Sequence, residues 1–196
     1  KPPDSAGVII AVNPNNPDGY IHNRNDLSKL IRPDRLLVVD EAFADTQPNC
    51  SVISATGNSG LIVLRSFGKF FGLAGARLGF AITNKDLARK LSLALGPWAV
   101  TGPTMEIASK AFADTNWIAK TRLRLKEDAT QLDSIVTPQL GVVVGGTDLF
   151  RLYEIGDANT YFKLASKGIL TRSFSDNPKI LRFGLPASNK DFERLK

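Results

Sequence analysis

One lysine in this sequence lies in a setting that favours cofactor chemistry over a solvated surface charge. Lys69 follows the apolar run 61–64, which is typical of a buried strand. Small residues surround it, namely Gly68, Gly72, Ala74, Gly75 and Gly79. Ser66 and Arg77 flank the lysine, and both side chains can bind an anion. A lysine that can form a Schiff base beside a phosphate site suggests pyridoxal phosphate (PLP), although a glycine-rich turn with a chance lysine is the alternative.

The composition is that of an ordinary globular protein, and it narrows the possible chemistry. Of the 196 residues, 43% are hydrophobic and 22% are charged, which allows one or two domains with an apolar core. No apolar run approaches the length of a membrane span, and the first residues lack the apolar core of a signal peptide. The single cysteine, Cys50, is consistent with a reducing cytoplasm, where we expect the protein to be. The single histidine, His22, argues against a histidine-rich metal site or a Ser-His-Asp triad.

The formal net charge of +6 fits small phosphorylated ligands better than nucleic acid, because the charges are scattered along the chain. The densest basic cluster, at residues 120–126, alternates along a predicted helix and is followed by Glu127 and Asp128. We interpret this cluster as a solvated helix face and expect neither a nucleic acid nor a membrane partner.

Polar residues follow the carboxyl ends of buried strands in the first half of the chain. The apolar runs 8–12, 36–39, 61–64 and 78–82 are continuous, which favours strands covered by helices on both faces. Asn16, Asp40 and the pair Ser66 and Lys69 follow the first three runs, at the edge where open α/β sheets usually carry ligand sites. The predicted fold class is therefore α/β, with a mostly parallel sheet flanked by helices.

The second half of the chain predicts helices followed by a small mixed unit. A short helix at 26–31 lies among the strands, and longer helices are predicted at 85–95, 104–112 and 117–136, the last ending near Pro138. Strands are predicted at 142–144, 149–153, 169–171 and 180–183, and a helix at 158–167 with Asp157 as its N-cap. We predict a partial large domain with its connecting helix at 1–140 and a small α+β domain at 141–196.

Three further residues have both a chemical and an ordinary interpretation. Asp40 could keep a pyridine nitrogen protonated, or it could be a helix cap or a salt-bridged carboxylate. Asn16 could donate its amide to a phenolate oxygen, or it could simply form the turn in which it lies. Arg182 lies in an apolar strand and needs a partner, which could be a substrate carboxylate or phosphate, or an acidic side chain of the protein.

The order of these motifs resembles the class I/II aminotransferases of PLP-dependent fold type I. The family's Asn-Pro-x-Gly turn matches residues 16–19, its Schiff-base motif matches residues 66–79, and its pyridine-nitrogen aspartate and carboxylate-binding arginine match Asp40 and Arg182. The resemblance implies that Asn16, Asp40, Ser66, Lys69 and Arg77 bind PLP, that Lys69 and Asp40 are catalytic, and that Arg182 and Arg172 bind substrate anions. Arg172 could instead be a surface charge.

One departure from the family pattern bears on the reaction. The family's aminotransferases usually have a tyrosine three residues after the aspartate, where this chain has Phe43, which lacks a hydroxyl. With the segments 95–100 and 181–186, this makes the chain look most like the threonine-phosphate decarboxylases of cobalamin biosynthesis. The resemblance implies decarboxylation of L-threonine O-3-phosphate to (R)-1-amino-2-propanol O-2-phosphate. A histidinol-phosphate-type aminotransferase, or an inactive fragment acting as a binding module, are the alternatives.

A second departure is length. The N-terminal portion of the family, with a phosphate-binding loop, a group that stacks on the pyridine ring and residues lent across a dimer, has no counterpart in these 196 residues. We therefore expect the C-terminal part of a PLP-dependent transferase fold, with unpaired strand edges and exposed apolar surface. The full-length protein is expected to be a homodimer that acts on a small phosphorylated amino acid.

Overall fold

The computed structural model describes residues 5–196, which fold as two compact units. The first unit combines the described residues up to Asn15 with Ile21–Thr115, and the second combines Asn16–Tyr20 with Asn116–Lys196. The second unit therefore includes a short turn that precedes most of the first unit in the chain. The predicted domain boundary between residues 140 and 141 stays a prediction, because compact packing alone does not test it.

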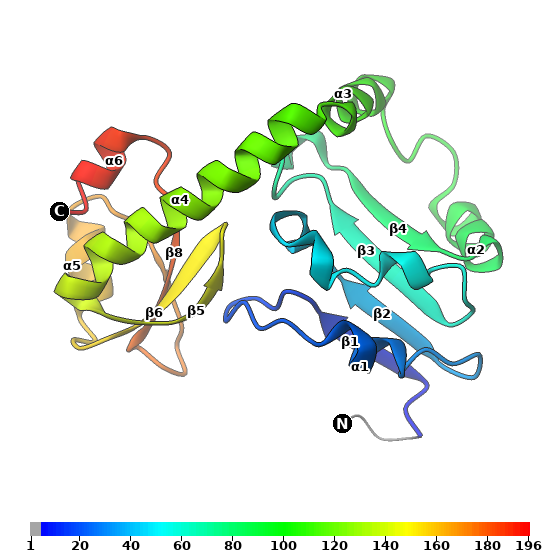
Figure 1. Cartoon of the computed structure of the whole chain (residues 1–196), viewed down its shortest axis with the longest axis horizontal. Coiled ribbons are helices and arrows are strands. Elements are labelled where there is room, and N and C mark those ends of the chain that lie inside the picture. The colour runs from blue at the N-terminus through cyan, green and yellow to red at the C-terminus, as the bar shows by residue number, and fades with distance from the viewer. Residues whose placement is uncertain (1–4) are drawn as a thin grey trace. The chain divides into compact units, whose positions relative to one another are not determined.

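The first unit is built on a four-stranded sheet of order β1-β2-β3-β4 (Figure 1). β1 (Val8–Val12), β2 (Leu36–Asp40) and β3 (Leu61–Ser66) are parallel, and β4 (Gly79–Thr83) pairs antiparallel with β3. All four strands were predicted, with small shifts at their ends. Because β1, β2 and β3 run in one direction, their carboxyl ends meet at one edge of the sheet, where the predicted site residues Asp40 and Ser66 lie.

Valine and leucine side chains of the parallel strands form the core of this unit. Leu37, Val39, Leu61 and Val63 are fully buried and pack with Leu27 of helix α1 (Arg24–Ser28). Coverage of the sheet is uneven, because Val8 and Ile10 of β1 remain 58% and 71% exposed. The prediction that helices cover both faces of the sheet is therefore wrong for β1. The predicted exposed apolar surface is confirmed there.

Capping side chains set the starts of the helices in the first unit. The Asn23 side chain accepts a hydrogen bond from the amide of Asn25, so α1 begins earlier than the predicted 26–31. Asn84 caps helix α2 (Lys85–Leu95), which has its predicted bounds, and Thr101 caps helix α3 (Gly102–Ala113). Short 3₁₀ turns fill the connections, at η1 (Ala44–Thr46), η2 (Pro48–Cys50), η3 (Ile53–Ala55) and η4 (Ala74–Ala76).

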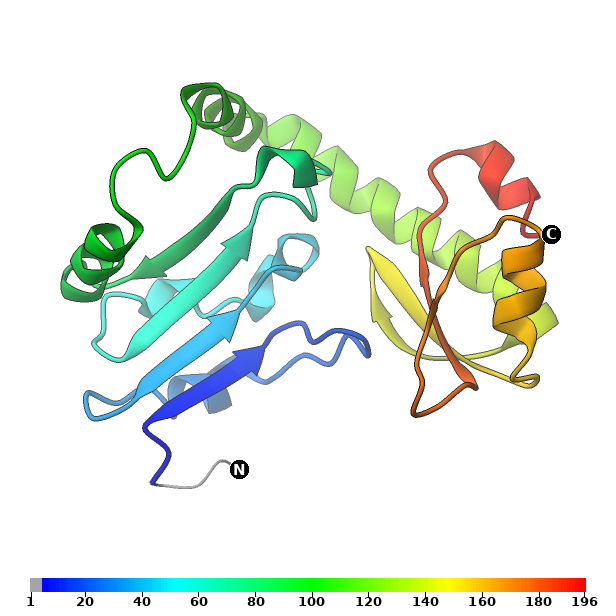
Figure 2. The ribbon, with the colours of Figure 1, turned by 180° about the vertical axis from the view of Figure 1, so that it is seen from behind.

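The second unit packs a long helix against an antiparallel sheet, as both views of the ribbon show (Figures 1 and 2). Helix α4 (Thr115–Leu140) leads into a sheet of order β5-β6-β8-β7, formed by β5 (Gly141–Thr147), β6 (Phe150–Ile155), β8 (Ile180–Gly184) and β7 (Arg172–Ser173). Helices α5 (Thr160–Ser166) and α6 (Asn189–Glu193) complete it. The core joins Leu132 and Val136 of α4 to Tyr153, Leu181 and Phe183 of the sheet.

Three predictions about this unit were wrong in detail. Helix α4 does not stop before Pro138 but includes it; the last turn buries Val136, and the side chain of Gln139 donates to the Ile135 carbonyl. The strand predicted at 169–171 lies at Arg172–Ser173, because the Ile169 amide bonds to the end of α5 instead. The N-cap of α5 is residue 159, and Asp157 supports that turn by accepting from two backbone amides.

Glycines let the turn at Asn16–Tyr20 pack directly on β5. The Gly146 amide donates to the Asp18 carbonyl at 2.7 Å. A Cβ on Gly19 would lie 1.8 Å from the Gly146 carbonyl oxygen, and a Cβ on Gly145 would lie 2.2 Å from that of Asp18. Only glycine permits so close an approach of two backbones, so these three residues hold the turn against β5 within the second unit.

A partly buried polar cluster joins α4 to β6. Arg151 donates two hydrogen bonds to the Asp133 carboxylate, at 2.9 and 2.7 Å, and the Tyr153 hydroxyl donates to the same carboxylate at 2.6 Å. Burial, and then the hydrogen bond to Asp133, raise the pKa of the Tyr153 hydroxyl above its usual value of 10.0.

The second unit is expected to lose stability in alkali through Tyr153. An unfolded chain releases this phenol proton near pH 10.0 while the folded one retains it, so the stabilisation is complete below pH 10.0 and lost as the pH rises further. Urea unfolding between pH 8 and 11 should show this loss. Tyr153→Phe should cost about 1–2 kcal/mol at pH 8 and flatten the alkaline decline. The control is Tyr161→Phe, and an equal alkaline decline in Tyr153→Phe would contradict the assignment.

Candidate functional site

A hollow of about 310 Å³ lies in the first unit at the carboxyl end of β3. It is lined by Ser66, Gly68, Lys69, Ala74, Arg77, Leu78 and Gly79. The register of β3 with β4 sets Ser66 opposite Gly79, so both ends of the motif reach the same hollow. Three of the predicted site residues, Ser66, Lys69 and Arg77, are therefore brought together, and all three can contact one anion.

Arg77 has an unusual backbone at this hollow. Its φ of 52° and ψ of 40° place it in the left-handed region at the end of η4, which few residues other than glycine adopt. Its guanidinium donates to the Ala74 carbonyl at 3.3 Å, and no acidic side chain within residues 5–196 pairs with it. A strained conformation that presents an unneutralised guanidinium to a hollow suits the binding of an anionic group.

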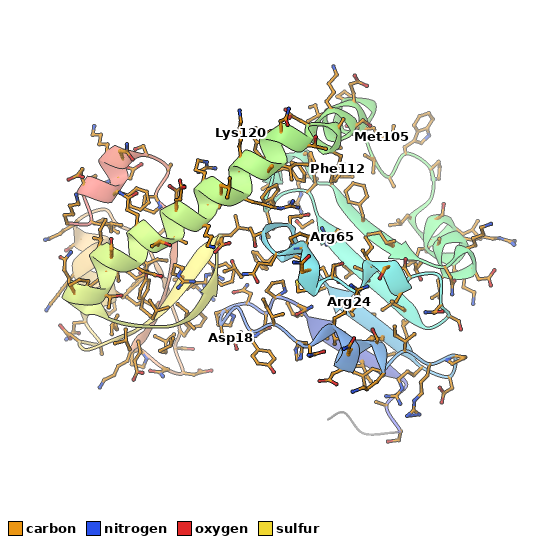
Figure 3. The ribbon with its side chains drawn as sticks, viewed as in Figure 1. Asp18, Arg24, Arg65, Met105, Phe112 and Lys120 are labelled. Atoms are coloured by element: carbon orange, nitrogen blue, oxygen red, sulfur yellow. The ribbon has the colours of Figure 1, made fainter. Side chains whose placement is uncertain are left out.

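Aromatic rings hold the turn that carries Lys69. Phe67 and Phe70 on either side of it are 0% and 4% exposed, and the lysine itself is exposed. Phe67 stacks on Phe71 with ring centroids 4.9 Å apart, and both contact Phe112 of α3, which Figure 3 labels. The sequence interpretation missed this cluster, although the repeated phenylalanines around the lysine were a signal for it. Their packing fixes the turn while leaving the amine accessible.

The Lys69 amine extends toward the loop that follows β2. Its Nζ lies 5.5 Å from the centroid of the Phe43 ring, a distance typical of a cation–π contact. Phe43 is three residues after Asp40, so a residue from the end of β3 reaches the loop that begins at the end of β2. The ring offers Lys69 a π face and no hydroxyl.

Asp40 ends β2 with part of its carboxylate available. It lies opposite Val12 of β1 and Leu64 of β3, its Oδ1 accepts from the Ala42 amide at 3.0 Å, and its carbonyl accepts from the Asn13 amide at 2.8 Å. In the described part of the chain no cation pairs with this carboxylate. The salt-bridge alternative for Asp40 is therefore not supported, and Oδ2 can still accept a hydrogen bond from a ligand.

Asn13 is a second asparagine at this edge, which the sequence interpretation missed. It is fully buried; its Nδ2 donates to the Cys50 carbonyl at 3.0 Å and its Oδ1 accepts from the His22 amide at 2.9 Å. With its backbone bond to Asp40, it ties the ends of β1 and β2 to two loops. An Asn-Pro pair directly after a buried strand was the signal, but the sequence alone marked it only as a turn.

The remaining predicted site residues, Asn16, Arg172 and Arg182, belong to the second unit. Arg172 and Arg182 are cross-strand partners in β7 and β8, so their side chains project from the same face. Arg182 donates to the Asn16 Oδ1 at 2.5 Å and stacks over the Phe150 ring at 5.3 Å. No carboxylate among residues 5–196 forms an ion pair with either arginine.

The electrostatics of this arginine pair favour an anionic ligand. Burial, and then the positive charge of Arg172, lower the pKa of the Arg182 guanidinium. Two like charges opposite each other repel, and an anion bound between them would relieve that repulsion. Because Asn16 uses its amide oxygen to accept from Arg182, its Nδ2 is left to donate to a ligand.

Neither a cluster of metal-binding side chains nor a membrane-spanning helix is found in the part of the chain that the structure describes. No cluster of three or more His, Cys, Asp or Glu side chains there could hold a metal ion. None of the helices in that part combines the length and apolar character that crossing a membrane requires.

Comparison with known proteins places the chain in a family. The family model of aminotransferase class I and II matches residues 1–176. Threonine-phosphate decarboxylase of Pseudomonas aeruginosa is 43% identical over 98% of this chain, and histidinol-phosphate aminotransferase of Thermoanaerobacter pseudethanolicus is 34% identical over 86%. The chain belongs to the aminotransferase class I and II family.

The fold of the chain is also that of a solved structure. The crystal structure of histidinol-phosphate aminotransferase from Sinorhizobium meliloti in complex with pyridoxal-5′-phosphate has a TM-score of 0.85 at 21% identity, which shows a common fold. The matched region covers 98% of this chain and 56% of that protein. The chain spans 59% of the length of the Pseudomonas relative and 48% of that of the Thermoanaerobacter relative.

Proposed function

We propose that the protein carrying this chain is a PLP-dependent decarboxylase that converts L-threonine O-3-phosphate to (R)-1-amino-2-propanol O-2-phosphate. The observation that carries the proposal is the hollow that Ser66, Lys69 and Arg77 share, in a chain 43% identical to a threonine-phosphate decarboxylase. Phe43, which offers Lys69 a ring without a hydroxyl, distinguishes this site from the family's usual aminotransferase pattern.

The residues of the first unit fit PLP by their chemistry. Ser66 and Arg77 would bind the PLP phosphate, and the Lys69 amine would hold the cofactor through its aldehyde group. Asp40, whose Oδ2 can accept a hydrogen bond, holds the proton on the pyridine nitrogen. Bound PLP supplies the electron sink that accepts the electron pair of the breaking Cα–carboxylate bond.

The remaining steps concern the substrate and its proton. The Lys69 amine would donate the proton that Cα takes up after carbon dioxide has left. As the family resemblance implies, Asn16 would donate a hydrogen bond from Nδ2 to the phenolate oxygen of PLP, while its Oδ1 accepts from Arg182. Arg182 and Arg172 bind the anionic groups of the substrate, which are a carboxylate and a phosphate.

The reaction distinguishes this proposal from its alternatives. The full-length protein with PLP is expected to release one carbon dioxide for each L-threonine O-3-phosphate consumed and to form the amino alcohol phosphate. Consumption of a keto acid with histidinol phosphate, without carbon dioxide release, would instead show an aminotransferase. A protein that fails to bind PLP in an absorption titration would be a binding module. We also propose that the full-length protein is a cytoplasmic homodimer. Sedimentation at several protein concentrations tests whether it forms a dimer.

A further inference from the structure

A partly buried ionic cluster joins the loop after β2 to β3, in the first unit. The Glu41 carboxylate is fully buried and accepts from the Ser51 hydroxyl at 2.5 Å, the Val52 amide at 2.7 Å and the Arg65 guanidinium at 2.9 Å. Arg65, labelled in Figure 3, also donates to Asp45 at 2.5 Å. We refer to Glu41, Arg65 and Asp45 as the anchor brace.

Each end of the anchor brace adjoins a residue assigned to the cofactor. Glu41 follows Asp40, and its amide donates to the Leu64 carbonyl of β3 at 2.9 Å. Arg65 precedes Ser66 on β3, and successive side chains of a strand point to opposite faces. Ser66 therefore lines the hollow while Arg65 extends to the loop after β2. The brace joins the pyridine-nitrogen anchor to the phosphate anchor.

Stability alone is a weak reason for this cluster. Removing a carboxylate from water is costly, and a buried ion pair often stabilises a fold no more than apolar side chains of similar volume would. The forked Arg65 guanidinium instead imposes direction, because its two donors reach two carboxylates of the same loop. Such a contact fixes the loop after β2 at one distance from the end of β3.

We propose that the anchor brace is a positioning device that fixes the span between Asp40 and Ser66 and so preorganises the site for a ligand held at both ends. This inference rests on the proposed function, because it takes PLP as that ligand. Arg65 and Glu41 then act through Asp40 and Ser66 without touching the cofactor. Loss of the fork should weaken the binding of PLP more than the binding of inorganic phosphate, because PLP needs both anchors and phosphate needs only the hollow.

Arg65→Lys in the full-length protein tests this, because lysine keeps the charge and lacks the fork. The matched control is Arg151→Lys, since each arginine is 19% exposed and each donates through two guanidinium nitrogens to carboxylate. Both variants should lose similar stability in urea unfolding. Only Arg65→Lys is expected to raise the Kd of the apoprotein for PLP, by about 10-fold, with its Kd for inorganic phosphate nearly unchanged.

Three outcomes would overturn the inference. One is a PLP Kd in Arg65→Lys that rises no more than in Arg151→Lys, and another is an equal loss of phosphate affinity. Both leave the proposed function standing, because the unmodified protein still binds PLP. A third is failure of the unmodified protein to bind PLP, which removes the proposed function as well. If Arg65→Lys does not fold, Asp45→Asn weakens one arm of the brace by removing its negative charge and should raise the PLP Kd by a smaller factor.

Discussion

Replacing Lys69 with alanine is expected to abolish covalent attachment of PLP and to lower the decarboxylation rate of the full-length protein by at least about 10⁴-fold. Proton transfer by a positioned group alone contributes about 10²- to 10⁴-fold, and Lys69 also forms the covalent bond. Borohydride reduction followed by peptide mass spectrometry measures the attachment, and carbon dioxide release measures the rate. Because Lys69 is exposed and its amine lies over the Phe43 ring, the variant should unfold at nearly the same urea concentration.

The matched control for this variant is Lys110→Ala. Lys110 is an exposed lysine of α3 that pairs with Glu106 one helical turn away, so its loss should leave both the adduct and the rate unchanged. A borohydride-stable adduct that persists in Lys69→Ala would place the covalent bond on another lysine. The hollow around Ser66 and Arg77 would then need another explanation.

The strands and the site motif were predictable because their signals are local. Continuous apolar runs gave β1 to β4, and the residues that end β2 and β3 follow directly from the direction of parallel strands. Small residues around Lys69 indicated the hollow that the structure contains. The functional roles of Lys69, Asp40, Arg77 and the other predicted site residues stay predictions, because geometry shows where they lie and not what they bind.

The missed features depend on contacts between distant residues. Glu41 was not recognised as a buried ion, because its partners Val52 and Arg65 lie 11 and 24 residues further along the chain. Gly145 and Gly146 lie just beyond the predicted strand 142–144, and their close approach to the turn was not predicted, because that turn precedes them by more than 120 residues. The pattern of a single segment carries no information about such partners, since burial arises only when segments meet.

The Asp40 carboxylate is expected to be the second largest contributor to the rate. Asp40→Asn keeps an oxygen that can accept from the Ala42 amide, so the end of β2 should stay in place. It removes the negative charge that would hold a proton on the pyridine nitrogen and so weakens the electron sink. We expect kcat to fall by roughly 10²- to 10³-fold with a much smaller change in KM, because removing one preorganised electrostatic contact costs about that factor.

Steady-state decarboxylation kinetics and the absorption spectrum of bound PLP would check this. The control is Asp86→Asn, which changes a carboxylate in the first turn of α2 and should cost only a few tenths of a kcal/mol in unfolding. A kcat within about threefold of the unmodified protein would contradict the role of Asp40. A loss of PLP affinity without a loss of kcat would mean that Asp40 anchors the cofactor and does not tune its chemistry. The kcat and the PLP affinity of this one variant therefore separate cofactor binding from catalysis at the end of β2.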